Sequence, residues 1–103
     1  MRKKQSRFAL NIAMLILEAE KRGYEVTLGD AYRDPRATFP YSHPKSNHYN
    51  RLAIDLNLFK DGKYIDTDEG HRELHEWFEK YCGGAPMIEN DFNHYSYEHE
   101  GVL

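Results

Sequence analysis

The sequence of 103 residues lacks several features that mark common classes of protein. It holds one cysteine, Cys82, so no disulfide can form within the chain. No apolar run approaches the roughly 18 residues that a membrane-spanning helix needs. Its 17 acidic and 14 basic residues leave a formal net charge of −3, which gives no general attraction to nucleic acid or an anionic membrane. We therefore expect neither a nucleic-acid partner nor a stable membrane association.

The first residues of the sequence do not predict a cleavable export signal, although they are basic and then apolar. Asn11, Glu18 and Glu20 interrupt the apolar run, and no small-residue cleavage site follows it. We interpret the segment as an amphipathic helix and expect a cytoplasmic protein on synthesis. Cys82 ends another predicted helix with no sign of an activated thiol nearby, so we interpret it as a small, partly buried apolar residue.

The hydrophobic pattern predicts one domain over residues 1–103, of the α+β class. We expect a small antiparallel sheet with helices packed on one side, joined in part by a hairpin turn at KDGK and a long proline-rich loop. The expected elements are helices over 6–22 and 69–81, strands over 24–33, 51–59 and 93–98, the turn at 60–63, and the loop at 34–47.

A single carboxylate, Asp55, lies within the strand predicted over 51–59. Leucines and an isoleucine alternate with Ala53, Asp55 and Asn57, so Asp55 points away from the apolar layer. Burying a carboxylate is costly unless it is paired or bound to a metal. Asp55 is therefore either a hydrogen-bond acceptor with a structural partner or a metal ligand.

The chain is rich in histidine, with six in 103 residues. His48 comes just before the strand that carries Asp55, and His94 begins the last predicted strand, three residues after Asp91. Two imidazole nitrogens and one carboxylate oxygen can fill three corners of a tetrahedral zinc site, leaving the fourth for water as in catalytic sites. Spacing alone leaves this open, because histidine and aspartate are also common on surfaces.

The other histidines carry weaker signals. His71 and His75 lie four apart on the second predicted helix, but the residue after His71 is arginine, so this is not a His-Glu-x-x-His motif. We interpret both as part of a solvated helix flank. His43 lies in the long loop, where we expect it to be exposed, with an approach to the cleft as the alternative, and His99 receives no role.

Three short motifs resemble those of the zinc D-alanyl-D-alanine carboxypeptidases. This family includes the VanY and VanX enzymes and the phage L-alanyl-D-glutamate endopeptidases that act as endolysins. SNHYNRLAID at 46–55 is similar to Ser-x-His-x-x-Gly-x-Ala-x-Asp, DFNH at 91–94 to the second motif, and AYR at 31–33 to the strand end with the family's arginine. Arg51 stands where the motif has glycine, so we expect a different turn before the strand.

The resemblance implies a role for each matched residue. His48, Asp55 and His94 would be the zinc ligands, and Asp91 the general base, with Glu89 as its rival. The matched arginine, Arg33, would act as a cation near the carbonyl oxygen or a substrate carboxylate, unless it pairs on the surface with Asp30 or Asp34. Ser46 would donate or accept a hydrogen bond at the pocket, unless it only starts a turn.

The resemblance also implies a function and a fold. The fold would be that shared by these peptidases and the Hedgehog signalling domain. The function would be hydrolysis of the peptidoglycan stem peptide, between L-alanine and D-glutamate, by a monomeric phage-type endolysin that reaches the cell wall through a separate pore. Two alternatives stay open: a D-alanyl-D-alanine carboxypeptidase, and a non-catalytic wall-binding module that keeps the fold.

Overall fold

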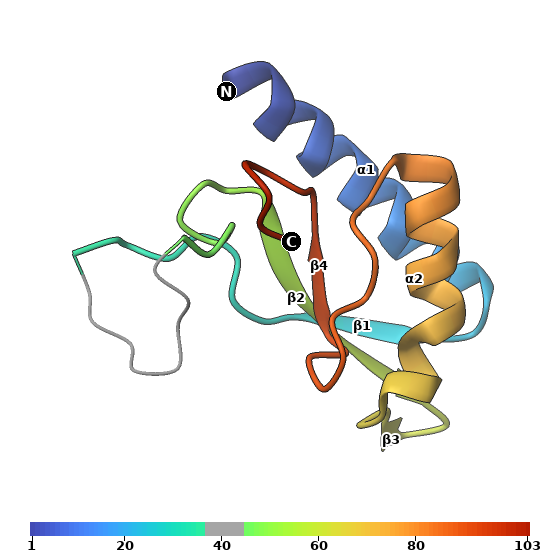
Figure 1. Ribbon diagram of the computed structural model, residues 1–103. Helices are drawn as coiled ribbons and strands as arrows, with labels where there is room; N and C mark the ends of the chain where they lie inside the picture. Colours follow the sequence, from blue (N-terminus) through green and yellow to red (C-terminus); the bar gives the residue numbers. More distant parts are fainter. Residues whose placement is uncertain (37–44) are drawn as a thin grey trace.

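The computed structural model describes residues 1–36 and 45–103 (Figure 1). Two helices and a four-stranded antiparallel sheet make up this part of the chain, which confirms the predicted α+β class. The elements in chain order are α1 (Arg2–Lys21), β1 (Glu25–Leu28), β2 (Ala53–Lys60), β3 (Lys63–Tyr64), α2 (Asp68–Cys82) and β4 (His94–Ser96).

Strand β2 is the centre of the sheet. It pairs with β1 along one edge, and with both β3 and β4 along the other. The predicted turn at 60–63 joins β2 to β3, and its two central residues, Asp61 and Gly62, have φ of 52° and 76°. Two consecutive left-handed residues are typical of the tight hairpin turn that matches strand twist.

Both helices pack on the same face of the sheet, as predicted. Alternate residues of β2, such as Leu56 and Leu58, face the helices together with Tyr95 of β4. Phe8 of α1 and Phe78 of α2 meet in the same core with their ring centroids 6.5 Å apart. Asp55 therefore lies on the face opposite the helices, as the alternation of the strand predicts.

Several element boundaries differ from the prediction. Helix α1 begins four residues early, at Arg2, because nothing in its first turns interrupts helical hydrogen bonding, and Met1 caps it without a side-chain bond. Strand β1 ends at Leu28 rather than near Arg33, although the bonds from Gly29 N to Asp55 O and from Asp55 N to Asp30 O continue the pairing. Helix α2 matches closely and is capped by the side chain of Thr67.

The predicted solvated flank of α2 is wrong. His71 and His75 are both buried, with exposed fractions of 0% and 2%. His71 Nδ1 lies 2.8 Å from the hydroxyl of Tyr95, and the ring of His75 stacks flat on the ring of the same tyrosine. Burial lowers the pKa of each histidine from 6.5 to about 4, so both are neutral near pH 7.

The interpretation of Cys82 is confirmed. Its side chain is buried at the end of α2, and burial raises the pKa of the thiol, which disfavours the reactive thiolate. His43 and most of the predicted loop at 34–47 lie outside the described residues.

Candidate metal centre

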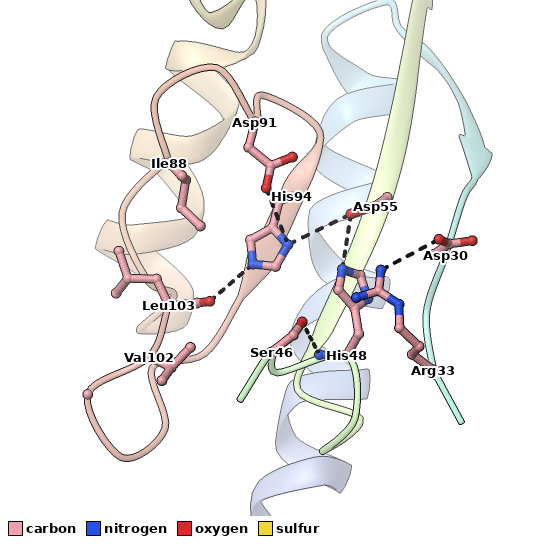
Figure 2. Close-up of a pocket in the computed structure, with 11 residues that line it drawn as sticks. Asp30, Arg33, Ser46, His48, Asp55, Ile88, Asp91, His94, Val102 and Leu103 are labelled. Carbon is pink, nitrogen blue, oxygen red and sulfur yellow. Dashed lines mark hydrogen bonds and ion pairs between the residues drawn. The ribbon is translucent and has the colours of Figure 1, made fainter. Parts of the chain in front are cut away.

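Three side chains from distant parts of the sequence meet on the face of the sheet that the helices leave uncovered (Figure 2). His48 lies in the turns before β2, Asp55 within β2, and His94 at the start of β4. Asp55 and His94 are direct partners in the β2–β4 pairing, so their side chains stand next to each other on one face. The register of the sheet thus brings two of the three residues together.

The donor atoms of the three residues converge on Asp55. Its Oδ1 lies 3.3 Å from Nε2 of His48 and 3.8 Å from Nδ1 of His94. One ligand atom of each residue lies within 4.8 Å of the others, and both histidines are buried. The group could therefore hold a metal ion.

The outward nitrogen of each histidine is bonded to a main-chain carbonyl. His48 Nδ1 lies 2.9 Å from the oxygen of Ala31, and His94 Nε2 lies 3.2 Å from the oxygen of Leu103. A ring N–H that donates to a carbonyl leaves the other nitrogen as a lone-pair donor, which is the usual second layer of a metal-binding histidine. In each neutral ring the nitrogen that faces Asp55 is then free to bind a metal, and in the protonated ring the same nitrogen donates to Asp55 instead.

The charge of Asp55 is stabilised by the same neighbours. Burial acts to raise its pKa, but the hydrogen bonds and positive charges of His48 and His94 together outweigh burial and lower the pKa to about 2. For His48, burial acts to lower the pKa, but the hydrogen bonds to Asp55 and to the Ala31 carbonyl, together with the charge of Asp55, outweigh burial, so the pKa is raised. An ionised Asp55 meets the requirement that a carboxylate ligand be deprotonated.

Local hydrogen bonds build the turn that presents His48. Ser46 Oγ accepts from the His48 N–H at 3.3 Å, so Ser46 does form a turn, and it also lines the cavity described below. Asn47 is fully buried and donates from Nδ2 to the carbonyls of Tyr97 and Val102. These bonds tie the His48 turn to the segment after β4.

Arg51 ends this turn in a left-handed conformation, with φ of 56°. Glycine adopts this region most readily, and the related motif has glycine at this position. Arg51 thus takes a backbone conformation that glycine adopts easily, and a difference between this turn and that of the motif stays a prediction. Its guanidinium lies 3.9 Å from the centroid of the Tyr32 ring, a cation–π contact that offsets part of the strain.

Asp91 lies on the turn that leads into β4. The His94 N–H donates to the Asp91 carbonyl at 3.1 Å, which brings both side chains to the same side. Asp91 Oδ2 is 4.0 Å from His94 Nδ1, and its side chain is half exposed. Glu89, the rival candidate, is exposed and is not among the described residues that line the cavity.

Arg33 is buried rather than a surface cation. Its Nη2 lies 3.7 Å from Oδ2 of Asp30, and its main-chain N–H donates to the carbonyl of His48 at 3.1 Å. Asp34, the other expected partner, pairs with Arg36 instead at 2.8 Å. Arg33 therefore lies beside the candidate metal ligands, and the carboxylate of Asp30 lies close to its guanidinium.

One cavity of about 650 Å³ is lined by the three candidate ligands together with Arg33, Ser46 and Asp91. Figure 2 shows them around a common opening, with Asp91 on one side of His94 and Arg33 beside His48. Residues of the C-terminal segment complete the wall. The lining residues are Asp30, Arg33, Ser46, His48, Asp55, Ile88, Asp91, His94, Gly101, Val102 and Leu103.

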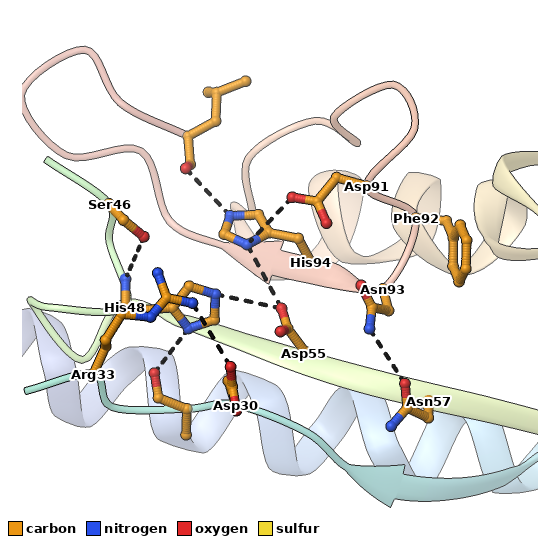
Figure 3. A network of polar contacts seen from close by, with 12 residues as sticks. Asp30, Arg33, Ser46, His48, Asp55, Asn57, Asp91, Phe92, Asn93 and His94 are labelled. Carbon is orange, nitrogen blue, oxygen red and sulfur yellow. Dashed lines mark hydrogen bonds and ion pairs between the residues drawn. The ribbon is translucent and has the colours of Figure 1, made fainter. Parts of the chain in front are cut away.

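Sequence reasoning missed the residues that position this site. His75 donates from Nε2 to the carbonyl of Phe92 at 2.7 Å, and thereby holds the turn between Asp91 and His94. A second hydrogen bond holds the same turn, because Asn93 Nδ2 donates to Oδ1 of Asn57 at 3.2 Å (Figure 3). Only the placement of an asparagine and a histidine in otherwise apolar patterns signals such bonds.

Glycine at position 29 gives Asp55 its space. A Cβ built there would lie 3.0 Å from Cβ of Asp55 and 3.2 Å from its carbonyl oxygen. Because the φ of Gly29 is ordinary, the need for glycine comes from close packing rather than from backbone conformation.

No known protein family, curated protein or solved structure matches the chain. The function of the chain is therefore inferred from the site itself and from the short motifs in the sequence.

Proposed function

We propose that this chain is a zinc-dependent peptidase that cleaves the peptidoglycan stem peptide between L-alanine and D-glutamate, as a phage-type endolysin. The observation that carries the proposal is the convergence of His48, Asp55 and His94, whose ligand atoms lie within 4.8 Å of one another. These are the residues that the motif resemblance implies as ligands. On this proposal the fold is related to that of the Hedgehog and D,D-peptidase domains.

The donor set supports zinc in particular. Two imidazole nitrogens and one carboxylate oxygen are ligands typical of catalytic zinc sites, which keep one position for water or substrate. Zinc held there would supply Lewis acidity, which acidifies water and polarises a peptide carbonyl.

Asp91 is the proposed general base. Its carboxylate is half exposed at the cavity, 4.0 Å from His94, where it can take a proton from water and return it to the leaving amine. In this role the proton rests on a carboxylate oxygen of Asp91 between the two transfers. A second cavity carboxylate, Asp30, is already engaged with Arg33.

Arg33 and Ser46 are proposed to orient the substrate. The buried guanidinium of Arg33 would stabilise negative charge on the carbonyl oxygen, a contribution worth about 3 kcal/mol in comparable sites. Ser46 Oγ already accepts one hydrogen bond, from the His48 N–H, and its own proton can be donated to a substrate carbonyl.

The balance of charge favours an endopeptidase over a carboxypeptidase. A carboxypeptidase closes around a terminal carboxylate and needs a cation for it. Among the described lining residues, Arg33 is the only lysine or arginine, and Asp30 lies 3.7 Å from it. If Arg33 stabilises the carbonyl oxygen, the described lining residues leave no second lysine or arginine for a terminal carboxylate.

Digestion of purified peptidoglycan, with mass spectrometry of the fragments, tests the proposal. We expect peptides with a new N-terminal D-glutamate, and muramyl-L-alanine left on the glycan. His94→Ala should abolish the release, and His99→Ala, outside the metal group, should not. Free D-alanine with an otherwise intact stem would instead favour the carboxypeptidase, and zinc binding without any hydrolysis would favour the wall-binding module.

A further inference from the structure

The outer face of α1 carries an apolar stripe that nothing in the described structure covers. Leu10, Met14 and Leu17 are 63%, 43% and 66% exposed. Their spacing of four and three residues places them on one side of the helix, opposite the side that carries Phe8 and Ile12 into the core. Exposed apolar side chains grouped in this way mark an interaction surface more often than isolated ones.

Cations gather at the N-terminal end of the same stripe. Arg2, Lys3 and Arg7 line a hollow of about 510 Å³ that reaches Leu10. Within the described part of the chain, no carboxylate forms an ion pair with any of these three. Lys4, by contrast, is engaged with the carbonyl of Glu98.

These cations do not serve the stability of the helix. The N-terminal end of a helix carries partial positive charge, which favours acidic residues there and disfavours basic ones. The first turn of α1 has no acidic residue, and the first 17 residues of the chain have none at all. A cluster placed against the helix dipole is better explained by a partner of negative charge.

The small net charge of the chain conceals this asymmetry. Residues 1–17 carry four basic side chains, so a total of −3 leaves seven excess negative charges on the rest. The expectation of no membrane association came from the total, which averages over two surfaces of opposite sign.

We propose that the outer face of α1 binds an anionic lipid surface. A helix with an apolar stripe and flanking cations lies in the interface between headgroups and acyl chains, with both features used at once. Nucleic acid would use the cations but not the stripe. A second copy in parallel alignment would cover the stripe but bring two sets of cations together. No helix among residues 1–36 and 45–103 could span a bilayer, so this binding is peripheral.

The position of α1 sets the orientation of the bound protein. The inner side of α1 packs on the sheet face with Leu56 and Tyr95, and Asp55 and His94 lie on the opposite face. A protein held by the outer side of α1 therefore directs the cavity away from the lipid. The lipid binding itself does not depend on the proposed function.

Vesicle flotation with the full chain tests this inference. We expect the protein to float with vesicles of phosphatidylglycerol and phosphatidylcholine in equal parts, and not with pure phosphatidylcholine. The double variant Leu10→Gln/Leu17→Gln should lose at least about tenfold in partitioning. Lys3→Gln/Arg7→Gln should lose roughly 30-fold and weaken the salt dependence. Both keep residues that favour helix, and circular dichroism checks that they fold.

Matched controls separate this surface from general stickiness. Tyr81→Gln removes an exposed aromatic side chain from α2, and Lys63→Gln removes an exposed cation from β3. Both controls should float like the wild type. The inference is overturned if the wild type does not bind the anionic vesicles at low salt, or if the controls lose as much as the α1 variants. A dimer in sedimentation that only Leu10→Gln/Leu17→Gln dissolves would also overturn it, in favour of a second copy.

Discussion

Acid should destabilise this domain through two histidines that lie outside the candidate metal centre. His71 and His75 are buried and neutral, and burial is the main reason that the pKa of each falls from 6.5 to about 4. In the unfolded chain both would regain an ordinary pKa and take up protons first. Because the folded-state pKa is lowered, the contribution of these two histidines to the free energy of unfolding is fully present above about pH 6.5. It is lost as the pH falls toward about 4.

The size of the effect follows from the two pKa values. Between pH 7 and pH 5, each histidine with these values lowers the free energy of unfolding by about 2 kcal/mol. We expect about 3–4 kcal/mol for the pair. That is a large part of the roughly 5–15 kcal/mol that stabilises a typical domain.

Urea denaturation at a series of pH values measures this slope, with a chelator present so that metal binding does not contribute. The double variant His71→Gln/His75→Gln should be less stable at every pH, because Tyr95 loses a partner, but its slope between pH 7 and pH 5 should be shallower. His99→Gln serves as the matched control and should keep the wild-type slope. Equal slopes in the wild type and the double variant would refute the argument, as would NMR titration of either ring with a midpoint near 6.5.

Three further predictions concern the metal centre. His94→Ala should lose zinc in metal analysis while His99→Ala retains one ion per chain, and retention by both would contradict the ligand assignment. Asp91→Asn should keep zinc and the fold but lower the hydrolysis rate roughly 10²–10⁴-fold, so an active variant would move the general base elsewhere. Gly29→Ala should crowd Asp55, cost about 1–3 kcal/mol in denaturation and weaken zinc binding, and an unchanged affinity would show that Asp55 tolerates the shift.

Strand alternation was sufficient to predict which way Asp55 points. The side chains of a strand alternate between its two faces, so a leucine layer on one face assigns Asp55 to the other. The meeting of Asp55 with His94 depends on the register between β2 and β4, which two segments far apart in sequence do not reveal. Residue types and spacing left their meeting open, and the motif resemblance implied that both are ligands of one ion.

The burial of His71 and His75 could not be predicted in the same way. A helix pattern tells which residues share a side, but not how far a neighbouring strand extends over that side. Tyr95 covers both rings and offers a hydroxyl to one of them, and Phe92 offers a carbonyl to the other. Buried polar side chains are stabilised by hydrogen-bond partners that come from elsewhere in the chain.

Because Asp55 and His94 are paired across two strands, an ion held by both would stabilise the strand register in addition to any role in chemistry. Strand β4 is only three residues long, and a slip of one residue would turn His94 toward the helices and Tyr95 into the cavity. An ion held by Asp55 of β2 and His94 of β4 would favour the register in which these two residues are paired and oppose that slip. Metal content would then report correct strand alignment, and a chain that folds with β4 displaced would be recognisable by its failure to hold the ion.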